Sequence, residues 1–305
     1  MGRDPPAMLY RNLQARHAFA IVVGIVMAMA SLAAGNTALA DRAVAAEPAG
    51  EERLLVPQSC DLVEGEGGVV VAVVDGDTLL LDSGLEVRLA GIQAPKLPLG
   101  RPDFTAWPLA AAAKAELERL ALGQAVQLRY GGLRRDRYGR ALAQVFVLPE
   151  AGDEIWLQQA MARAGLARVY SFADNRQCIG KLIEAERSAR RSTLGLWADP
   201  YYLIRSATDP SLAERSDSYD LVEGRVLSVG ERGPIVYLDF GLSWSTDFTA
   251  VMSSEATAAL VASGLVPGDL KGRRLRVRGW LEQRGGPSIR VTHPEQLEWL
   301  DSDGR

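Results

Sequence analysis

Three short stretches of this sequence combine residue types that suit phosphodiester chemistry. Residues 75–78 read D-G-D-T, so Asp77 lies at a turn where side-chain and backbone oxygens can meet a hard cation such as Ca²⁺. Arg88 lies in an apolar run of β type, where an arginine needs an anionic partner. Residues 129–140 form a dense basic patch, and such a patch suits phosphate.

Each stretch also has a simpler structural interpretation. D-G-D-T is a common composition for a plain hairpin turn, because Asp and Gly favour turn backbone. Arg88 can form an ordinary salt bridge with Asp or Glu. Residues 129–140 contain five arginines against one aspartate, more than a solvated hairpin requires, so phosphate contact through Arg135 and Arg137 is at least as good an interpretation.

The composition excludes several catalytic classes. The chain of 305 residues has only two histidines, and His17 falls in the N-terminal segment, which leaves His293. A histidine-based nuclease, a Ser-His-Asp hydrolase and a His-ligated zinc site therefore lack parts. The formal net charge of −4 gives no general attraction for polyanions, so any nucleic-acid surface must be a local patch.

The first forty residues predict an export signal. Arginines precede an apolar run at residues 18–34, and Ala38-Leu39-Ala40 offers the small-x-small pattern of a cleavage site. We therefore expect residues 1–40 to be removed and the protein to be periplasmic or secreted. The alternative is an uncleaved membrane anchor, because the run is close to the roughly 17–25 residues that span a bilayer.

Beyond this segment, short β-type runs and helices follow in the order typical of an OB-type barrel. Five strands with a helix after the third carry the prediction. In chain order we expect strands at 69–74, 78–82 and 85–92, a helix at 107–121, strands at 125–130 and 141–148, and helices at 155–164 and 177–191.

The chain after residue 217 repeats this element order. D-L-V-E-G occurs at 61–65 and again at 220–224, and each copy leads into three β-type runs, a helix and two more runs. We therefore predict a second, smaller OB-like barrel in a chain that is mainly β with helices. Its Trp244, Trp280 and residues 276–278 suit either stacking on a ligand or an ordinary core, and we favour the core.

The two cysteines are expected to form a disulfide. Cys60 precedes the first strand and Cys178 lies near the start of the third helix, so a bond would fasten the entry of the barrel to the helix that closes it. Disulfides persist in the compartment that the export signal implies. The alternative is two separate buried thiols.

Several motifs in this order resemble the staphylococcal nuclease (thermonuclease) family. They are D-G-D-T, V-R-L-A-G-I-x-A-P, D-R-Y-G-R and G-L-A-R-V-Y, and they cover residues 68–199. The resemblance implies an OB barrel with three helices and a Ca²⁺-dependent nuclease. It implies that Asp77 is a carboxylate ligand of Ca²⁺, that Arg88 and Arg140 hold the phosphate, and that Tyr138 and Tyr170 line the nucleotide site.

The expected domains follow from these patterns. They are an export signal at 1–40, a flexible linker at 41–59, a thermonuclease-like OB domain at 60–200, a linker at 201–217 and a second OB-like domain at 218–302.

The sequence departs from the family pattern at two positions of the site. Gln93 stands where the family has a second metal-binding carboxylate, and Lys96 stands where it has the glutamate that assists the attacking water. The Gln93 amide and the Ala94 carbonyl can still offer oxygens, but with one negative charge fewer we expect weak Ca²⁺ binding. An ammonium cannot accept a proton, so the general base is missing.

Two rescues and one substitute arrangement are open. Lys96 can act as a base if burial removes its proton, or Asp103 can bring a carboxylate into the emptied place. We favour the arrangement in which Lys96 neutralises Asp77 in place of the metal.

Three hypotheses for function follow. We favour an exported thermonuclease-like protein that recognises nucleic-acid or nucleotide phosphodiesters through Arg88 and Arg140, with Lys96 in an altered role and hydrolysis weak or absent. The second hypothesis is an active secreted Ca²⁺-dependent nuclease with an altered site. The third is a non-catalytic envelope interaction module that binds protein or glycan. DNA and RNA are both open as partners.

Overall fold

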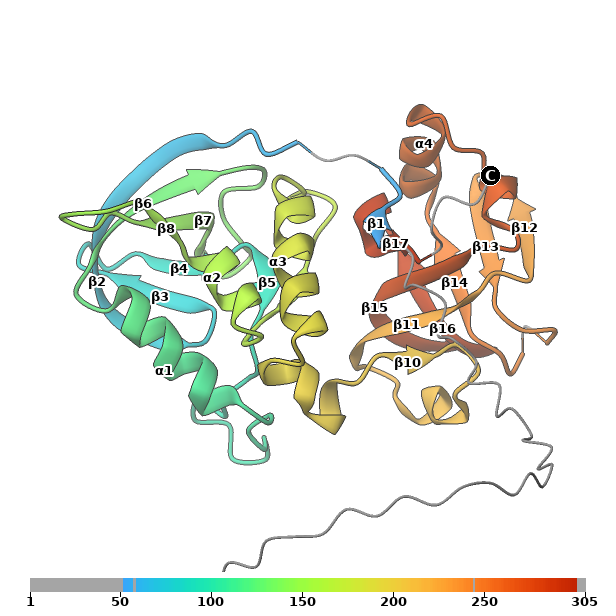
Figure 1. Ribbon diagram of the computed structural model, residues 1–305, viewed down its shortest axis with the longest axis horizontal. Coiled ribbons are helices and arrows are strands. Elements are labelled where there is room, and N and C mark those ends of the chain that lie inside the picture. The colour runs from blue at the N-terminus through green and yellow to red at the C-terminus, as the bar shows by residue number, and fades with distance from the viewer. Residues whose placement is uncertain (1–51, 57–58, 244, 301–305) are drawn as a thin grey trace, which may run out of the picture. The chain divides into compact units, whose positions relative to one another are not determined.

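The computed structural model describes residues 52–56, 59–243 and 245–300, which belong to one compact unit. The predicted export signal and Trp244 lie outside these residues. The described chain is mostly β with four α-helices, and most of its strands form two barrel-like sheets (Figure 1). Within this part of the chain, no helix combines the length and the apolar character needed to cross a membrane.

The first barrel is a closed circuit of five strands. These are β2 (Val63–Asp75), β3 (Thr78–Leu81), β4 (Glu86–Leu89), β6 (Ala125–Tyr130) and β7 (Ala141–Val147). β2 pairs antiparallel with β3 and β6, β3 with β4, and β6 with β7, while β4 runs parallel to β7. The OB-type barrel predicted from the element order is therefore confirmed.

Glycines explain why β2 is longer than the sequence predicts. The strand begins at Val63 rather than at Val69, although the glycine-rich residues 64–68 have little β propensity. A β-carbon on Gly65 would lie 2.3 Å from the Tyr130 ring, so only glycine allows β2 and β6 to approach this closely.

The third predicted strand, residues 85–92, divides in two at a glycine. Gly91 has a φ of +86°, and a β-carbon there would lie 2.8 Å from the Leu182 side chain. The chain therefore leaves the barrel after β4 and forms β5 (Gly91–Gln93), which pairs antiparallel with β9 (Arg168–Tyr170). This two-stranded pair carries several residues of the candidate site.

Three helices pack on the first barrel. They are α1 (Ala110–Ala121), α2 (Leu157–Arg163), which follows the short strand β8 (Ile155–Trp156), and α3 (Ile179–Arg191). In α1 the buried residues recur at helical spacing, which gives the helix one apolar face toward the barrel. These residues are Ala110, Ala113, Leu117 and Ala121.

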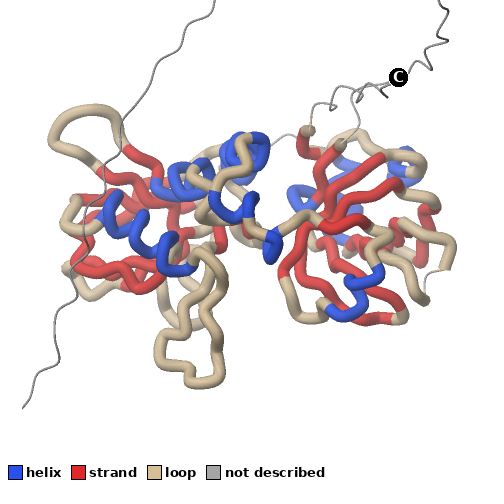
Figure 2. The backbone as a smooth tube through the Cα atoms, turned by 60° about the horizontal axis from the view of Figure 1, so that its bottom comes forward, coloured by secondary structure: helices blue, strands red, loops and turns tan. Residues whose placement is uncertain are grey.

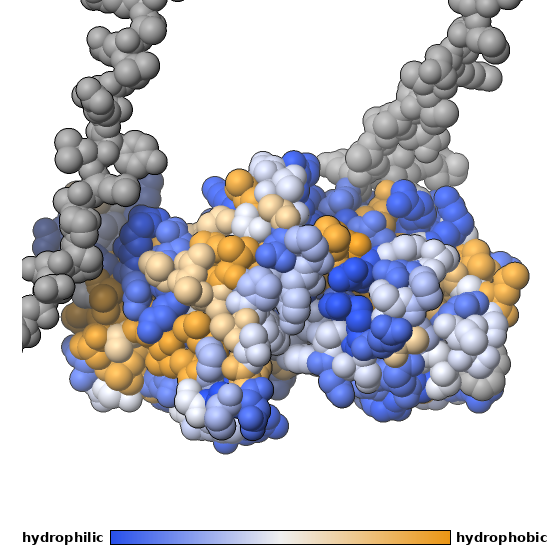
Figure 3. All heavy atoms as spheres, turned by 90° about the horizontal axis from the view of Figure 1, so that it is seen from below, coloured by the Kyte–Doolittle hydropathy of each residue, from blue (hydrophilic) through white to orange (hydrophobic). Residues whose placement is uncertain are grey.

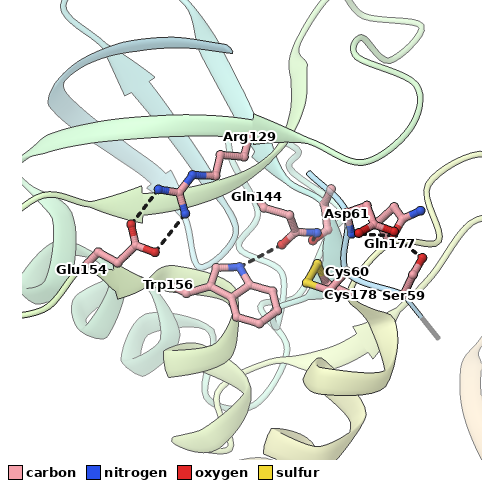
Figure 4. Close-up of a disulfide and its surroundings, with 10 residues drawn as sticks. Ser59, Cys60, Asp61, Arg129, Gln144, Glu154, Trp156, Gln177 and Cys178 are labelled. Carbon is pink, nitrogen blue, oxygen red and sulfur yellow. Dashed lines mark hydrogen bonds and ion pairs between the residues drawn. A yellow bond between two sulfur atoms is a disulfide. The ribbon is translucent and has the colours of Figure 1, made fainter. Parts of the chain in front are cut away.

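The predicted disulfide between Cys60 and Cys178 is confirmed. Their Cα atoms lie 4.2 Å apart, and the bond joins the segment before β2 to the start of α3 (Figure 4). Gln177 accepts hydrogen bonds from the Ser59 hydroxyl at 2.9 Å and from the Asp61 N–H at 3.0 Å, so both sides of the bond are held.

The second sheet repeats the strand pairing of the first barrel, and Figure 2 shows the strands gathered in two groups. Its elements are β11 (Tyr219–Arg225), β12 (Ser228–Arg232), β13 (Ile235–Asp239), β14 (Thr249–Met252), α4 (Ser254–Ala262), β15 (Arg274–Arg284) and β16 (Gly286–Val291). β14, the strand before the helix, runs parallel to β16, and β11 pairs with β15, the strand that follows the helix. The first barrel has the same two pairings, β4 with β7 and β2 with β6. The prediction of a second OB-like sheet is confirmed.

Short elements connect these parts. The segment 52–56, inside the predicted linker 41–59, contains β1 (Arg53–Leu54), which pairs with β17 (Leu297–Trp299), and the next residue, Leu55, is buried. Inside the predicted linker 201–217, β10 (Arg205–Ser206) pairs parallel with β11. The 3₁₀ helices are η1 (Gly195–Ala198), η2 (Pro200–Tyr202), η3 (Pro210–Glu214), η4 (Pro267–Leu270) and η5 (Pro294–Gln296).

A buried ion cluster joins α3 to the second sheet. Arg278 of β15 is fully buried and contacts Glu186 of α3 at 3.0 Å and Glu298 of β17 at 2.5 Å. Arg276 contacts Glu298 at 3.4 Å and Glu52 at 2.9 Å. Burial alone would raise the pKa of the Glu298 carboxyl, but the charges of the surrounding arginines lower it well below its ordinary value.

One face of the molecule shows how polarity is distributed. Hydrophobic residues gather on the left of Figure 3, the side of the first barrel, and the second barrel shows mainly hydrophilic residues in that view.

Candidate nucleic-acid site

The D-G-D-T turn holds two buried carboxylates side by side. It connects β2 to β3, and the Asp77 N–H donates to Asp75 Oδ1 at 3.1 Å, which stabilises the turn. A β-carbon on Gly76 would lie 2.7 Å from Ala94 and from Ala113 of α1, so glycine is required at this position. The turn is thereby pressed against α1, and both carboxylates are buried.

Two cations converge on the Asp77 carboxylate. The Lys96 ammonium lies 2.7 Å from Oδ1 and 2.8 Å from Oδ2, and Arg88 forms an ion pair with Oδ1. The Ala94 N–H donates to Oδ2 at 2.7 Å. Lys96 also lies 3.2 Å from Asp75 Oδ2, so one ammonium bridges both carboxylates. The contact expected between Lys96 and Asp77 is present.

These contacts move the pKa values of the two carboxyls in opposite directions. Burial alone would raise the pKa of Asp77, but the charges of Arg88 and Lys96 outweigh it and hold this pKa well below its ordinary value. Burial, followed by the neighbouring Asp77 charge, raises the pKa of Asp75. Asp77 is therefore firmly ionised and already neutralised by protein cations.

The oxygens at this turn do not fit the Ca²⁺ that the resemblance implies. Both Asp77 oxygens are engaged by Lys96, and the Gln93 Oε1 atom accepts a hydrogen bond from Arg168 at 3.2 Å. Gln93 and Arg168 are both buried, so this amide faces a cation of the protein. Among the described residues, no group of three or more His, Cys, Asp or Glu side chains is arranged to hold a metal. A calcium ion would have to displace an ammonium to bind here.

A pocket of about 560 Å³ opens beside the turn and brings together most of the predicted substrate residues. Arg88, Arg137, Tyr138, Arg140 and Tyr170 all line it. They come from β4, from the loop before β7 and from β9, which the barrel and the β5–β9 pair place around one opening. With Phe172, the pocket therefore combines three guanidinium groups with three aromatic rings, and the carboxylates of Asp136 and Asp174 also belong to its lining.

Arg140 is partly exposed at the wall of this pocket. Its Nε and Nη2 atoms lie 2.7 Å from Asp136 Oδ2, and its Nη1 atom lies 3.7 Å from Glu86. With 27 % of its side chain exposed, Arg140 is oriented by Asp136 and still reaches solvent. Such a geometry presents a guanidinium edge to an incoming anion.

Comparison with known proteins identifies the family. The sequence model described as staphylococcal nuclease homologue matches residues 86–199. A thermonuclease of Staphylococcus intermedius is 31% identical over 138 residues, which cover 44% of this chain and 78% of that protein. The chain belongs to the staphylococcal nuclease family. An uncharacterized endonuclease of Escherichia coli O157:H7 is 35% identical over 135 residues, 43% of this chain and 77% of the relative. A micrococcal nuclease of Shigella flexneri is 33% identical over 140 residues, 44% of this chain and 74% of the relative.

Not every predicted site residue of this staphylococcal nuclease relative lies at the pocket. Arg135 instead pairs with Glu66 at 3.1 Å and is exposed. Lys96 contacts the carboxylates of the D-G-D-T turn and does not belong to the residues that line the pocket. Asp103 is exposed, and no hydrogen bond or ion pair joins it to Asp77 in the described chain.

Three residues of the site were missed in the sequence. Asp75 shares Lys96 with Asp77, and the D-x-D spacing across a hairpin turn was the available signal. Asp136 orients Arg140, and its place in D-R-Y-G-R, four residues before that arginine, pointed to it. Arg168 faces Gln93 from the neighbouring strand, a contact with no local signal in the sequence.

Proposed function

We propose that this chain recognises nucleic-acid or nucleotide phosphodiesters in the pocket lined by Arg88 and Arg140, and that its Ca²⁺-dependent hydrolysis is weak or absent. The observation that carries the proposal is the position of Lys96. Its ammonium lies within 2.7 and 2.8 Å of the two Asp77 oxygens, at the turn where the family resemblance places a metal ion.

Recognition is supported by the charge and shape of the pocket. Arg88, Arg137 and Arg140 line it together, so a phosphate entering it would meet more than one guanidinium. Tyr138 is 68% exposed and Tyr170 forms another part of the wall, which offers rings to a base or sugar. The chain as a whole is acidic, and the three arginines of this pocket outnumber its two lining carboxylates, Asp136 and Asp174, so a polyanion would be attracted here.

Weak hydrolysis is supported by the missing base and the occupied carboxylate. Lys96 replaces the glutamate of the family pattern, and a general base contributes about 10²–10⁴-fold in rate. The same side chain already neutralises the Asp77 carboxylate, so a metal ion would bind only weakly at the turn.

An active Ca²⁺-dependent nuclease is the second candidate, because Asp75 supplies a further buried carboxylate 3.2 Å from Lys96. If Lys96 moved aside, Asp75 and Asp77 would face a cation together. The names of the relatives, thermonuclease and micrococcal nuclease, are consistent with this candidate.

We also propose that the protein is exported, to the periplasm or outside the cell. The export pattern at 1–40 supports this, and so does the disulfide between Cys60 and Cys178, since such bonds persist in oxidising compartments.

Titration of the protein with thymidine 3′,5′-bisphosphate, in the presence of a metal chelator, tests whether the pocket recognises phosphate. We expect the affinity to fall as salt increases, and Arg140→Ala to weaken binding by about 1.5–3 kcal/mol, as for a charged hydrogen bond. Arg119→Ala is the matched control, because Arg119 pairs with Glu116 on α1 and does not line the pocket. Binding that ignores both salt and Arg140 would favour an interaction module instead.

A further inference from the structure

An aromatic side chain of the second barrel stands next to the wall of the nucleotide pocket. Tyr170 and Phe172 line the pocket, and the Tyr170 hydroxyl accepts a hydrogen bond from Trp280 Nε1 at 2.9 Å. Trp280 belongs to β15, and its ring centre lies 6.4 Å from that of Tyr170. The second barrel therefore contributes a ring directly beside residues of the first.

Trp280 is exposed although its polar atom is satisfied. It is 41% exposed, and Phe172 is 46% exposed. A tryptophan whose N–H already has a partner and whose ring still reaches solvent has apolar surface available to a ligand. Our expectation that Trp280 is an ordinary core residue does not describe this position.

The ring is also held firmly in place. Tyr219 lies opposite Trp280 in the β11–β15 pair, and its ring packs edge-on against Tyr170 with centres 4.8 Å apart. Two residues before Trp280, the buried Arg278 donates a hydrogen bond to the Val169 carbonyl of β9 at 3.2 Å. β9 and β15 are thus tied together next to the ring, so a ligand would meet a preorganised surface.

We propose that Trp280 stacks on a base of single-stranded nucleic acid whose phosphate occupies the pocket, so that the second barrel supplies a further nucleotide-binding position. This inference rests on the proposed function of the pocket. The occupant is argued from continuity with the arginine-lined pocket and from charge. Arg88 and Arg140 attract a phosphate, and the neighbouring nucleotide then brings a flat base to the ring beside Tyr170.

The test compares a mononucleotide with a longer ligand, both in chelator. Thymidine 3′,5′-bisphosphate fills only the pocket, whereas a short oligothymidylate also reaches Trp280. We expect Trp280→Ala to weaken oligothymidylate binding by about 5- to 140-fold, the range for one base–aromatic stack, and to affect bisphosphate binding far less, because Trp280 does not itself line the pocket. Tyr201→Ala is the matched control, because Tyr201 is also 41% exposed and does not line the pocket.

Two further variants separate stacking from folding. Trp280→Phe keeps a flat ring and should retain most of the oligothymidylate affinity, while Trp280→Leu keeps apolar bulk without a ring and should lose it. Equal binding of oligothymidylate by the Phe and Leu variants would overturn the proposal. So would unchanged oligothymidylate affinity in Trp280→Ala when bisphosphate binding still depends on Arg140.

Failure of the proposed function gives a different result. In that case neither ligand binds in an Arg140-dependent way, whatever residue stands at position 280.

Discussion

Replacement of Lys96 by methionine should destabilise the protein markedly. The substitution keeps the length of the side chain and removes the ammonium that lies 2.7 Å from Asp77 and 3.2 Å from Asp75. Asp77 is fully buried, and after the change Arg88 remains as its ion-pair partner. Two buried carboxylates would then share one cation.

The size of the effect follows from this geometry. Removing one partner of a buried ion pair costs about 3–5 kcal/mol. Lys96 is 22% exposed and Arg88 still compensates Asp77, so we expect a smaller loss, about 2–3 kcal/mol in the free energy of unfolding. Lys114→Met is the control, since Lys114 lies 3.8 Å from Glu118 in an exposed i,i+4 pair worth about 0.3–0.5 kcal/mol.

Urea unfolding of the natural chain and both variants measures these losses. The Lys96→Met effect should be largest near neutral pH and should shrink as the pH falls below the ordinary Asp range of about 4. The depressed pKa of Asp77 gives the sign, because stability from its ionised form is present above the unfolded pKa and is lost as the pH falls toward the folded one. A loss no larger than that of Lys114→Met would refute the account of the turn.

Three further predictions concern stability. Reduction of the Cys60–Cys178 bond, which spans 118 residues, should lower the free energy of unfolding by up to about 5 kcal/mol, measured by urea unfolding with and without reductant. Burial, with the charges of nearby arginines, lowers the pKa of His293 to about 4, so stability should fall by up to about 3 kcal/mol as pH drops from 6.5 to 4, and His293→Gln should flatten this dependence. Glu298→Gln should lower the free energy of unfolding by about 3–5 kcal/mol, because the buried Arg278 would keep only one of its two carboxylate partners, Glu186. A loss below about 1 kcal/mol would contradict a stabilising role for Glu298.

Local patterns were enough to predict the barrels and part of the site. The strands on either side of D-G-D-T and the helix after the third strand both follow from short-range signals. The Lys96–Asp77 contact was also predictable, because the motif resemblance assigned both residues to one site.

The contacts that shape the rest of the site join segments far apart in the chain. Gln93 and Arg168 are 75 residues apart, and Tyr170 and Trp280 are 110 apart. Such pairs depend on how β5, β9 and β15 pack, and no local sequence pattern at either residue predicts its partner. The break of the strand at Gly91 could not be predicted from the sequence for the same reason. It follows from the packing of the distant Leu182 side chain against this glycine.

We propose that Lys96 and Gln93 weaken hydrolysis at this site. The direct measurement is Ca²⁺-dependent cleavage of single-stranded DNA and of RNA by the natural chain and by the double variant Lys96→Glu, Gln93→Asp, each with a chelator control. We predict that the double variant cleaves at least about 100-fold faster than the natural chain, the scale of a restored general base. Equal Ca²⁺-dependent rates in the two proteins would contradict the claim.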